Sequence, residues 1–212
     1  MDIALHAEVR CTDGLCGHTT AVVMKPSTEE VTHVVVQTKG MVHELYLVPL
    51  ELIAESTPYG IQLQCSLDEL AKQEPYTKSR FIDMEGAGEA GEGIGGAAAM
   101  WPYATPDDLD PGSVPLYETV EQVPHGELAI HRGARVEASD GTVGQVDQFL
   151  VNPDNYRITH LILRTGHLWG KQDVTIPFTQ IDRVEEDVVY LKLDKKAVGQ
   201  LPAIPAHRQE PR

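Results

Sequence analysis

Short runs of alternating or β-branched apolar residues cover much of the chain. The runs 31–38 and 158–165 have Val, Ile and Leu in the middle and polar residues at one end, which is typical of buried strands. We expect these two runs to be the most buried strands of the molecule. Further strands are predicted at 44–49, 60–63, 173–177 and 188–191.

The second half of this pattern repeats the first. A shift of 127 residues, which becomes 128 after the middle of each copy, aligns the following pairs: Val9 with Val136, Asp13 with Asp140, Gly14 with Gly141, Gly17 with Gly144, Pro26 with Pro153, His33 with His160, Pro49 with Pro177, Ile61 with Val189 and Ser66 with Asp194. Each copy is roughly 70 to 80 residues long, which is too long for a solenoid repeat and suits a small domain. The chain is therefore predicted to hold two copies of one unit.

An Asp-Gly pair between short apolar runs marks a tight hairpin in each copy, at 13–14 and at 140–141. Such a turn needs positive φ values, which glycine adopts without steric cost. A third shared glycine, Gly17 or Gly144, lies inside the following strand. It predicts a bulge or a tight bend in a coiled sheet.

A short helix is predicted at the end of each copy. Ser66 and Asp194 stand at the start of these helices, where a side-chain oxygen can accept a hydrogen bond from an otherwise unpaired helical N–H. Five or six short strands and one terminal helix do not suit an open α/β layer. They predict an all-β protein made of two small, strongly coiled antiparallel barrels.

The second copy resembles the PRC-barrel domain family along the segments 133–153, 158–164 and 174–177. That family includes the cytoplasmic domain of the photosynthetic reaction-centre H subunit and the C-terminal domain of a ribosome-maturation factor. The resemblance is good from 128 to 197 and weaker, but in register, from 3 to 72. It implies the barrel fold in both copies. The matched turn and proline residues have no catalytic role in the family, so the resemblance implies architecture more than activity.

The distribution of charge divides the chain into three segments. Residues 83–127 carry 10 of the 32 acidic side chains and none of the 17 basic ones. We therefore predict a first barrel domain at 1–82, a flexible, acidic and glycine-rich linker at 83–111, and a second barrel domain at 112–212 with its core at 128–200. Because the linker is flexible, few contacts are expected between the two barrels.

The formal net charge of −15 bears on partners and location. Nucleic acids are held by clusters of Lys and Arg, so direct binding of DNA or RNA is not expected, and a protein with a basic surface is the more natural partner. No apolar run reaches the length of about 18 residues that a membrane-spanning helix needs, and no signal peptide is evident at the N-terminus. These features predict a cytoplasmic protein without a membrane span.

Two aromatic clusters are the candidate contact sites. The loop 165–172 places His167, Leu168 and Trp169 at its tip, where the first copy has a shorter connection. Trp101 and Tyr103 form an apolar cluster in the acidic linker. Each cluster either packs against a barrel or anchors a partner, since exposed Trp and Tyr are favoured binding residues.

The three cysteines allow more than one interpretation. Cys11 and Cys16 flank the first Asp-Gly turn, and in a two-residue hairpin they would lie opposite each other. With His18 they could hold zinc, but structural zinc sites need four ligands, and Cys65 stands apart in the sequence. Buried core cysteines are favoured over a redox pair or a metal site, and no cofactor is expected.

His33 and His160 occupy equivalent positions beside a threonine. A proton relay is one interpretation, by analogy with the H subunit that the chain resembles, but a strand histidine bonded to the backbone is the ordinary case. The copies share no nucleophile with a matching base.

We therefore predict a non-catalytic adaptor that binds other proteins. One alternative is a subunit or regulator of an electron-transfer complex, and another is a ribosome-assembly accessory that contacts a basic ribosomal protein. Both alternatives follow from the family resemblance. Self-association of the chain stays open as well.

Overall fold

The computed structural model describes residues 1–39, 43–81, 117–165, 173–185 and 187–204. The chain divides into two compact units. The larger unit comprises Met1–Tyr76 and Gln122–Arg212, and the smaller one comprises Thr77–Glu121. We call Met1–Tyr76 the first copy and Gln122–Arg212 the second copy.

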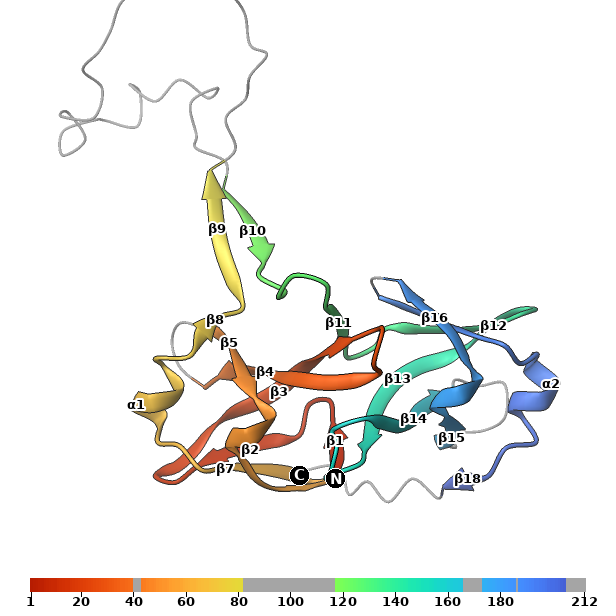
Figure 1. Cartoon of the computed structure of the whole chain (residues 1–212), viewed down its shortest axis with the longest axis horizontal. Helices are drawn as coiled ribbons and strands as arrows, with labels where there is room; N and C mark the ends of the chain where they lie inside the picture. The colour runs from red at the N-terminus through yellow and green to blue at the C-terminus, as the bar shows by residue number, and fades with distance from the viewer. Residues whose placement is uncertain (40–42, 82–116, 166–172, 186, 205–212) are drawn as a thin grey trace, which may run out of the picture. The chain divides into compact units, whose positions relative to one another are not determined.

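Two eight-stranded sheets build the larger unit (Figure 1). One sheet has the order β6 (Ile53–Thr57), β7 (Gly60–Leu63), β2 (Glu8–Cys11), β3 (Gly14–Lys25), β4 (Glu30–Thr38), β5 (Leu45–Pro49) and β8 (Glu74–Pro75), with β11 (Leu128–His131) added to β3. The other has the order β16 (Ile181–Glu185), β17 (Val188–Leu191), β12 (Arg135–Ala138), β13 (Gly141–Val151), β14 (Ile158–Thr165), β15 (Asp173–Pro177) and β18 (Ala203–Ile204), with β1 (Asp2–Ala4) added to β13. The short helices are α1 (Leu67–Leu70), α2 (Lys195–Val198) and the 3-10 turns η1 (Leu50–Leu52) and η4 (Phe178–Gln180).

The all-β fold predicted from the sequence is confirmed, and the predicted strands appear in both copies. One detail differs, because each sheet contains a parallel pair, β2 with β7 and β12 with β17. In each copy the chain runs through several antiparallel strands after its second strand, β2 or β12. It then returns to the free edge of that strand and runs parallel to it as β7 or β17. A purely antiparallel barrel is therefore not what the chain forms.

The two copies exchange their first strands. β1 pairs antiparallel with β13 of the second copy and places Ile3 opposite Phe149. β11 pairs antiparallel with β3 of the first copy and places Ile130 opposite Val22. The two registers are related by the same shift of 127 that relates the two sequences. The exchange is thus reciprocal and follows a pseudo-twofold axis.

A pair of backbone hydrogen bonds repeats this symmetry. The N–H of Val31 donates to the carbonyl of Tyr156, and the N–H of Ile158 donates to the carbonyl of Glu29, each at 2.9 Å. Glu29 and Tyr156 both adopt positive φ, at 60° and 54°. Both turns that precede the central strands therefore take the same uncommon conformation in order to reach the other copy.

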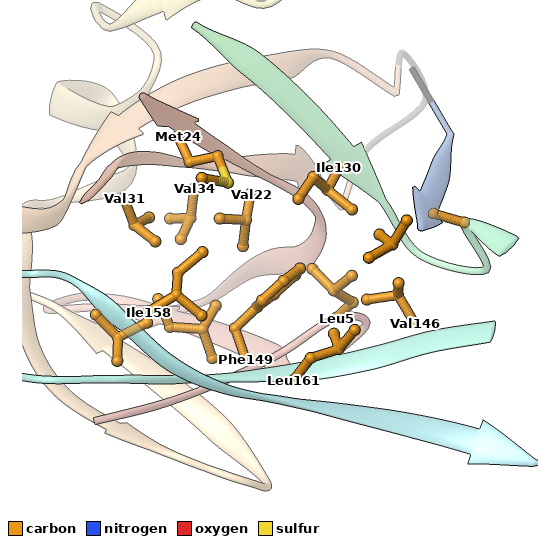
Figure 2. Close-up of a cluster of buried hydrophobic side chains, with 14 of the residues drawn as sticks. Leu5, Val22, Met24, Val31, Val34, Ile130, Val146, Phe149, Ile158 and Leu161 are labelled. Carbon is orange, nitrogen blue, oxygen red and sulfur yellow. The ribbon is translucent and has the colours of Figure 1, made fainter. Parts of the chain in front are cut away.

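A single hydrophobic core joins the copies. Figure 2 shows Val22 and Val34 of the first copy beside Phe149 and Leu161 of the second, and all four side chains have no exposed surface. From the sequence we expected few contacts between the copies, whereas the structure shows a shared core and shared sheets. The physical reason is that each copy lends its first apolar strand to the other. The domain boundaries predicted above stay predictions.

Glycine is required at the predicted bulges for a steric reason. A Cβ on Gly17 would lie 2.0 Å from the carbonyl oxygen of Gln37, and one on Gly144 would lie 2.4 Å from that of Arg164. The pairing register shifts beside both glycines, in the β2–β3 and β12–β13 pairs. The prediction of a bulge at this position is therefore confirmed in both copies.

The predicted helix caps are present, and the turn aspartates reinforce them. Ser66 accepts a hydrogen bond from the N–H of Glu69, and Asp194 accepts one from the N–H of Ala197. Asp13 accepts a hydrogen bond from the N–H of Leu67 in α1 at 3.1 Å. In the second copy its counterpart Asp140 accepts one from the N–H of Lys195 in α2. The repeated aspartate thus serves the helix as well as the turn.

The smaller unit contains an antiparallel pair of strands, β9 (Thr77–Phe81) and β10 (Tyr117–Glu121). Within the larger unit, the N–H of Gln122 donates to the carbonyl of Tyr76 at 2.5 Å. The chain therefore leaves and re-enters the larger unit at adjacent residues, so residues 77–121 do not bridge a distance between the two copies. The predicted linker at 83–111 lies outside the described residues.

Candidate functional site

The residues that the sequence singled out as partner contacts lie outside the described residues. These residues are Trp101, Tyr103, His167, Leu168 and Trp169. They stay predictions, and the candidate site is built from the described surface.

A hollow of about 810 Å³ is formed by the second copy. Its walls come from β11, the turn that follows it, β12, β16 and β17. The lining residues are Leu128, His131, Arg132, Gly133, Ala134, Arg135, Val184, Glu185, Asp187, Val188 and Tyr190. We call this the second-copy hollow.

His131 is held at the wall of this hollow by two hydrogen bonds. Its Nδ1 lies 2.7 Å from Oδ1 of Asp187, and its Nε2 lies 3.0 Å from the hydroxyl of Tyr76. In the tautomer that carries its proton on Nδ1, the ring donates to the Asp187 carboxylate through Nδ1–H, and Nε2 can accept from the phenol. Tyr76 is only 1% exposed, so its hydroxyl positions His131 rather than meeting a substrate. The three residues come from three separate stretches of both copies, and sequence spacing gave no signal of them.

Charged side chains at the rim of the second-copy hollow are partly paired with one another. Arg183 donates from Nε to Oε1 of Glu185 at 2.7 Å, and its guanidinium stacks 4.0 Å from the ring centre of Tyr190. Glu185 raises the pKa of Arg183 by accepting this hydrogen bond. Arg135 is exposed and forms no ion pair within the described part of the chain.

The first copy has a smaller hollow at the equivalent place, with a volume of about 380 Å³. It is lined by Glu8, Arg10, Glu55, Thr57, Tyr59, Gly60, Ile61 and Gln62. The shifts of 127 and 128 align Glu8 with Arg135 and Tyr59 with Asp187. Tyr59 is 68% exposed, and Glu8 is paired with Arg10 at 3.4 Å. Equivalent strands, β2, β6 and β7 in one copy and β12, β16 and β17 in the other, therefore contribute to two hollows with different chemistry, and β11 lines the second-copy hollow in addition. We call this one the first-copy hollow.

The three cysteines lie together in the core of the first copy. Cys11, Cys16 and Cys65 are buried free thiols, and the thiol of Cys11 contacts both of the others. Burial, strengthened by the hydrogen bond with Cys16, raises the pKa of Cys11 to about 12. Burial also raises the pKa of the other two. These thiols are protonated near neutral pH, which makes them poor nucleophiles and poor metal ligands.

The expectation that Cys11 and Cys16 lie directly opposite each other on the two strands of the hairpin is wrong. Cys11 lies opposite Gly14, and the bulge removes Cys16 from the register of β2 with β3. Instead, the thiol of Cys16 donates to the carbonyl of Val9 at 3.1 Å. No group of three potential metal ligands converges in the described ranges.

The repeated histidines have unequal surroundings. Nδ1 of His33 lies 3.0 Å from Oγ1 of Thr32, and Oε2 of Glu127 is 3.9 Å away. Glu127 also accepts a hydrogen bond from Thr32. Glu127 belongs to the second copy, so a search for carboxylates near His33 in sequence could not find it.

No helix within the described ranges is long and apolar enough to cross a membrane. A comparison with curated proteins gave no match to the chain. In the comparison with family models, residues 132–198 match the PRC-barrel domain. This segment begins at the turn after β11 and ends with α2, so it contains most of the lining of the second-copy hollow. The chain therefore carries a PRC-barrel domain at residues 132–198.

Proposed function

We propose that this protein is a non-catalytic adaptor of the cytoplasm that binds one partner in each of its two hollows. A PRC-barrel domain indicates a protein-interaction or complex-associated module. The observation that carries the proposal is the pair of hollows on one unit, built by equivalent strands and lined by different side chains. Two unlike sites on one scaffold suit the joining of two unlike partners.

The shared core supports this role because it fixes the two hollows relative to each other. Each hollow includes a parallel strand pair, β2 with β7 or β12 with β17. The second strand of both pairs is anchored in the core by a buried residue, Ile61 or Val189. Partners bound at both hollows would be held at a set distance, which a flexible tether could not provide.

A non-catalytic role is supported by the groups that line the second-copy hollow. Both ring nitrogens of His131 are already hydrogen-bonded, one to a buried phenol and one to a carboxylate. A general base needs a free nitrogen within reach of a substrate proton. The hydrogen-bonded chain through His131 is therefore better suited to fixing the wall of the hollow than to proton transfer.

A partner with a basic surface is supported by the acidic segment 83–127. This segment carries 10 acidic and no basic side chains. Charge of one sign in one stretch steers oppositely charged proteins toward it at moderate ionic strength. Capture of such a partner should therefore weaken as salt is raised from low to physiological concentration.

Affinity capture from a native lysate tests the adaptor role. Full-length protein is compared with Tyr59→Ala in the first-copy hollow and Arg135→Glu in the second-copy hollow. Lys196→Glu, on the exposed side of α2, is the charge-matched control. We expect each hollow variant to lose a different captured protein and the control to lose none. Capture lists that are identical for all four proteins would contradict the proposal.

A further inference from the structure

We propose that the second-copy hollow binds an extended, acidic segment of a partner protein, which adds as an extra strand between β11 and β16. The inference rests on the proposed adaptor function and specifies the chemistry of one of its partners. It concerns a different contact from the one expected for the acidic segment 83–127.

Two strand edges border this hollow without a strand partner among the described residues. Among the described strands, β11 pairs along one edge with β3, and β16 is the outermost strand of its sheet and pairs with β17 alone. Leu128 and His131 from β11 and Val184 from β16 line the hollow. An unpaired edge presents N–H and C=O groups that an added strand can satisfy. The hollow is thus flanked by two edges of the kind that accept a peptide strand.

In the first copy, the corresponding gap between β1 and β6 is closed by a side-chain hydrogen bond. There, Ser56 of β6 donates a hydrogen bond from Oγ to the carbonyl oxygen of Asp2 on β1 at 2.5 Å. The second copy has Val184 at the position of Ser56 and Ala129 at the position of Asp2. A valine side chain cannot donate this bond. The β11 and β16 edges therefore border a hollow to which β11 contributes, whereas no β1 residue lines the first-copy hollow.

The apolar part of the lining suits an alternating sequence. Leu128, Val184 and Val188 are half-buried, and Ala134 is buried beside them. Successive side chains of an extended peptide point to opposite faces. Apolar residues at every second position of the ligand would cover these side chains, and the residues between them would reach the rim.

The rim favours carboxylates in those intervening positions. Its own acidic groups are already engaged, since Glu185 accepts from Arg183 and Asp187 accepts from His131, both at 2.7 Å. Arg135 is exposed and has no ion pair with any described residue. A guanidinium binds a carboxylate through two parallel hydrogen bonds, which are stronger than neutral ones. An acidic ligand would therefore supply the missing counter-charge.

Peptide titration of the full-length protein tests this inference. Two fluorescein-labelled octapeptides alternate valine with glutamate or valine with lysine, and binding is followed by anisotropy. We expect the glutamate peptide to bind and to shift the amide NMR signals of β11, β16 and β17. Arg135→Glu, which installs the residue that the first copy has at Glu8, and Arg135→Ala should each weaken binding at least about tenfold. Lys196→Glu should leave the affinity unchanged.

Three results would overturn the inference: equal binding of the lysine peptide, unchanged affinity of both Arg135 variants, or NMR shifts confined to other strands. A glutamate peptide with proline at alternate positions cannot pair as a strand, so equal binding of that peptide would also overturn it. The adaptor role is judged separately by the capture experiment. If captured proteins are lost with Arg135→Glu while no glutamate peptide binds, the role stands and the acidic strand is rejected.

Discussion

Phe149 allows a direct test of whether the two copies unfold together. Its side chain is fully buried in the shared core, opposite Ile3 of the first copy and near Val22 in Figure 2. Truncation of a buried Phe to Ala costs about 3 to 5 kcal/mol, because apolar contacts are lost and a cavity remains. With a urea m value of about 2 kcal/mol per molar, the midpoint of unfolding should fall by about 2 M. If the copies are one cooperative unit, Phe149→Ala lowers the midpoint of both.

Residue-resolved amide NMR during urea titration separates the two copies. Signals from β4 and β5 report the first copy, and signals from β14 and β15 report the second. We expect one common midpoint in the unaltered protein and one common, lower midpoint in Phe149→Ala. Tyr59→Ala is the control, because removal of an exposed side chain changes stability by less than about 0.5 kcal/mol. If only the second-copy signals move in Phe149→Ala, the shared core does not couple the copies and the argument fails.

Gly144→Ala should lower the urea midpoint by an amount equivalent to about 1 to 3 kcal/mol, because the added Cβ collides with the carbonyl of Arg164; an unchanged midpoint would show that the strands can separate there at no cost. The triple change Cys11→Ala, Cys16→Val and Cys65→Leu, which copies the equivalent residues of the second copy, should fold with a loss below about 1.5 kcal/mol, measured by thermal unfolding. The unaltered protein should lose stability as pH rises from 9.0 toward about 12, because Cys11 deprotonates more readily in the unfolded chain than in the fold. This loss should be smaller in the triple variant, and equal losses in the two proteins would contradict the assignment. Replacement of residues 82–116 by Asn-Gly should close β9 and β10 as a hairpin and leave the urea midpoint unchanged within about 0.5 kcal/mol, and a large loss would show that this segment supports the fold.

The elements of the fold could be predicted from the sequence because each depends on local chemistry. The glycines at the bulges and the caps Ser66 and Asp194 appear where their residue types predict them. The two hairpins form at the Asp-Gly pairs, but their turn residues are 12–13 and 139–140, one position earlier than predicted, and each glycine already pairs in the following strand. The strand exchange could not be predicted in the same way. Ile3 and Ile130 are both isoleucines at equivalent positions of the two copies. The hydrophobic pattern of the sequence is therefore the same whether each first strand pairs within its own copy or with the other copy. Only the register of long-range pairs separates the two arrangements.

The candidate site was less accessible to sequence reasoning, because strands that are distant in sequence form it. Tyr76, His131 and Asp187 are separated by more than fifty residues at each step, and none lies in a recognisable motif. The aromatic residues that drew notice, such as Trp169, lie in segments outside the described residues. The sequence signal for the site was the difference between the two copies at aligned positions, as where Ser56 of the first copy is aligned with Val184 of the second.

Differences between the copies also explain why a tandem chain suits the proposed adaptor better than a pair of identical chains. In a symmetric homodimer, one substitution would alter both hollows at once, and the two sites would stay identical. In a tandem chain each site can change alone. Ser56 closes the gap between β6 and β1, while Val184 cannot form the corresponding bond. The exchange of Glu8 for Arg135 reverses the charge at one aligned position. The shared core preserves the geometry of the pair through these changes, so that the two surfaces can acquire different partners on one scaffold.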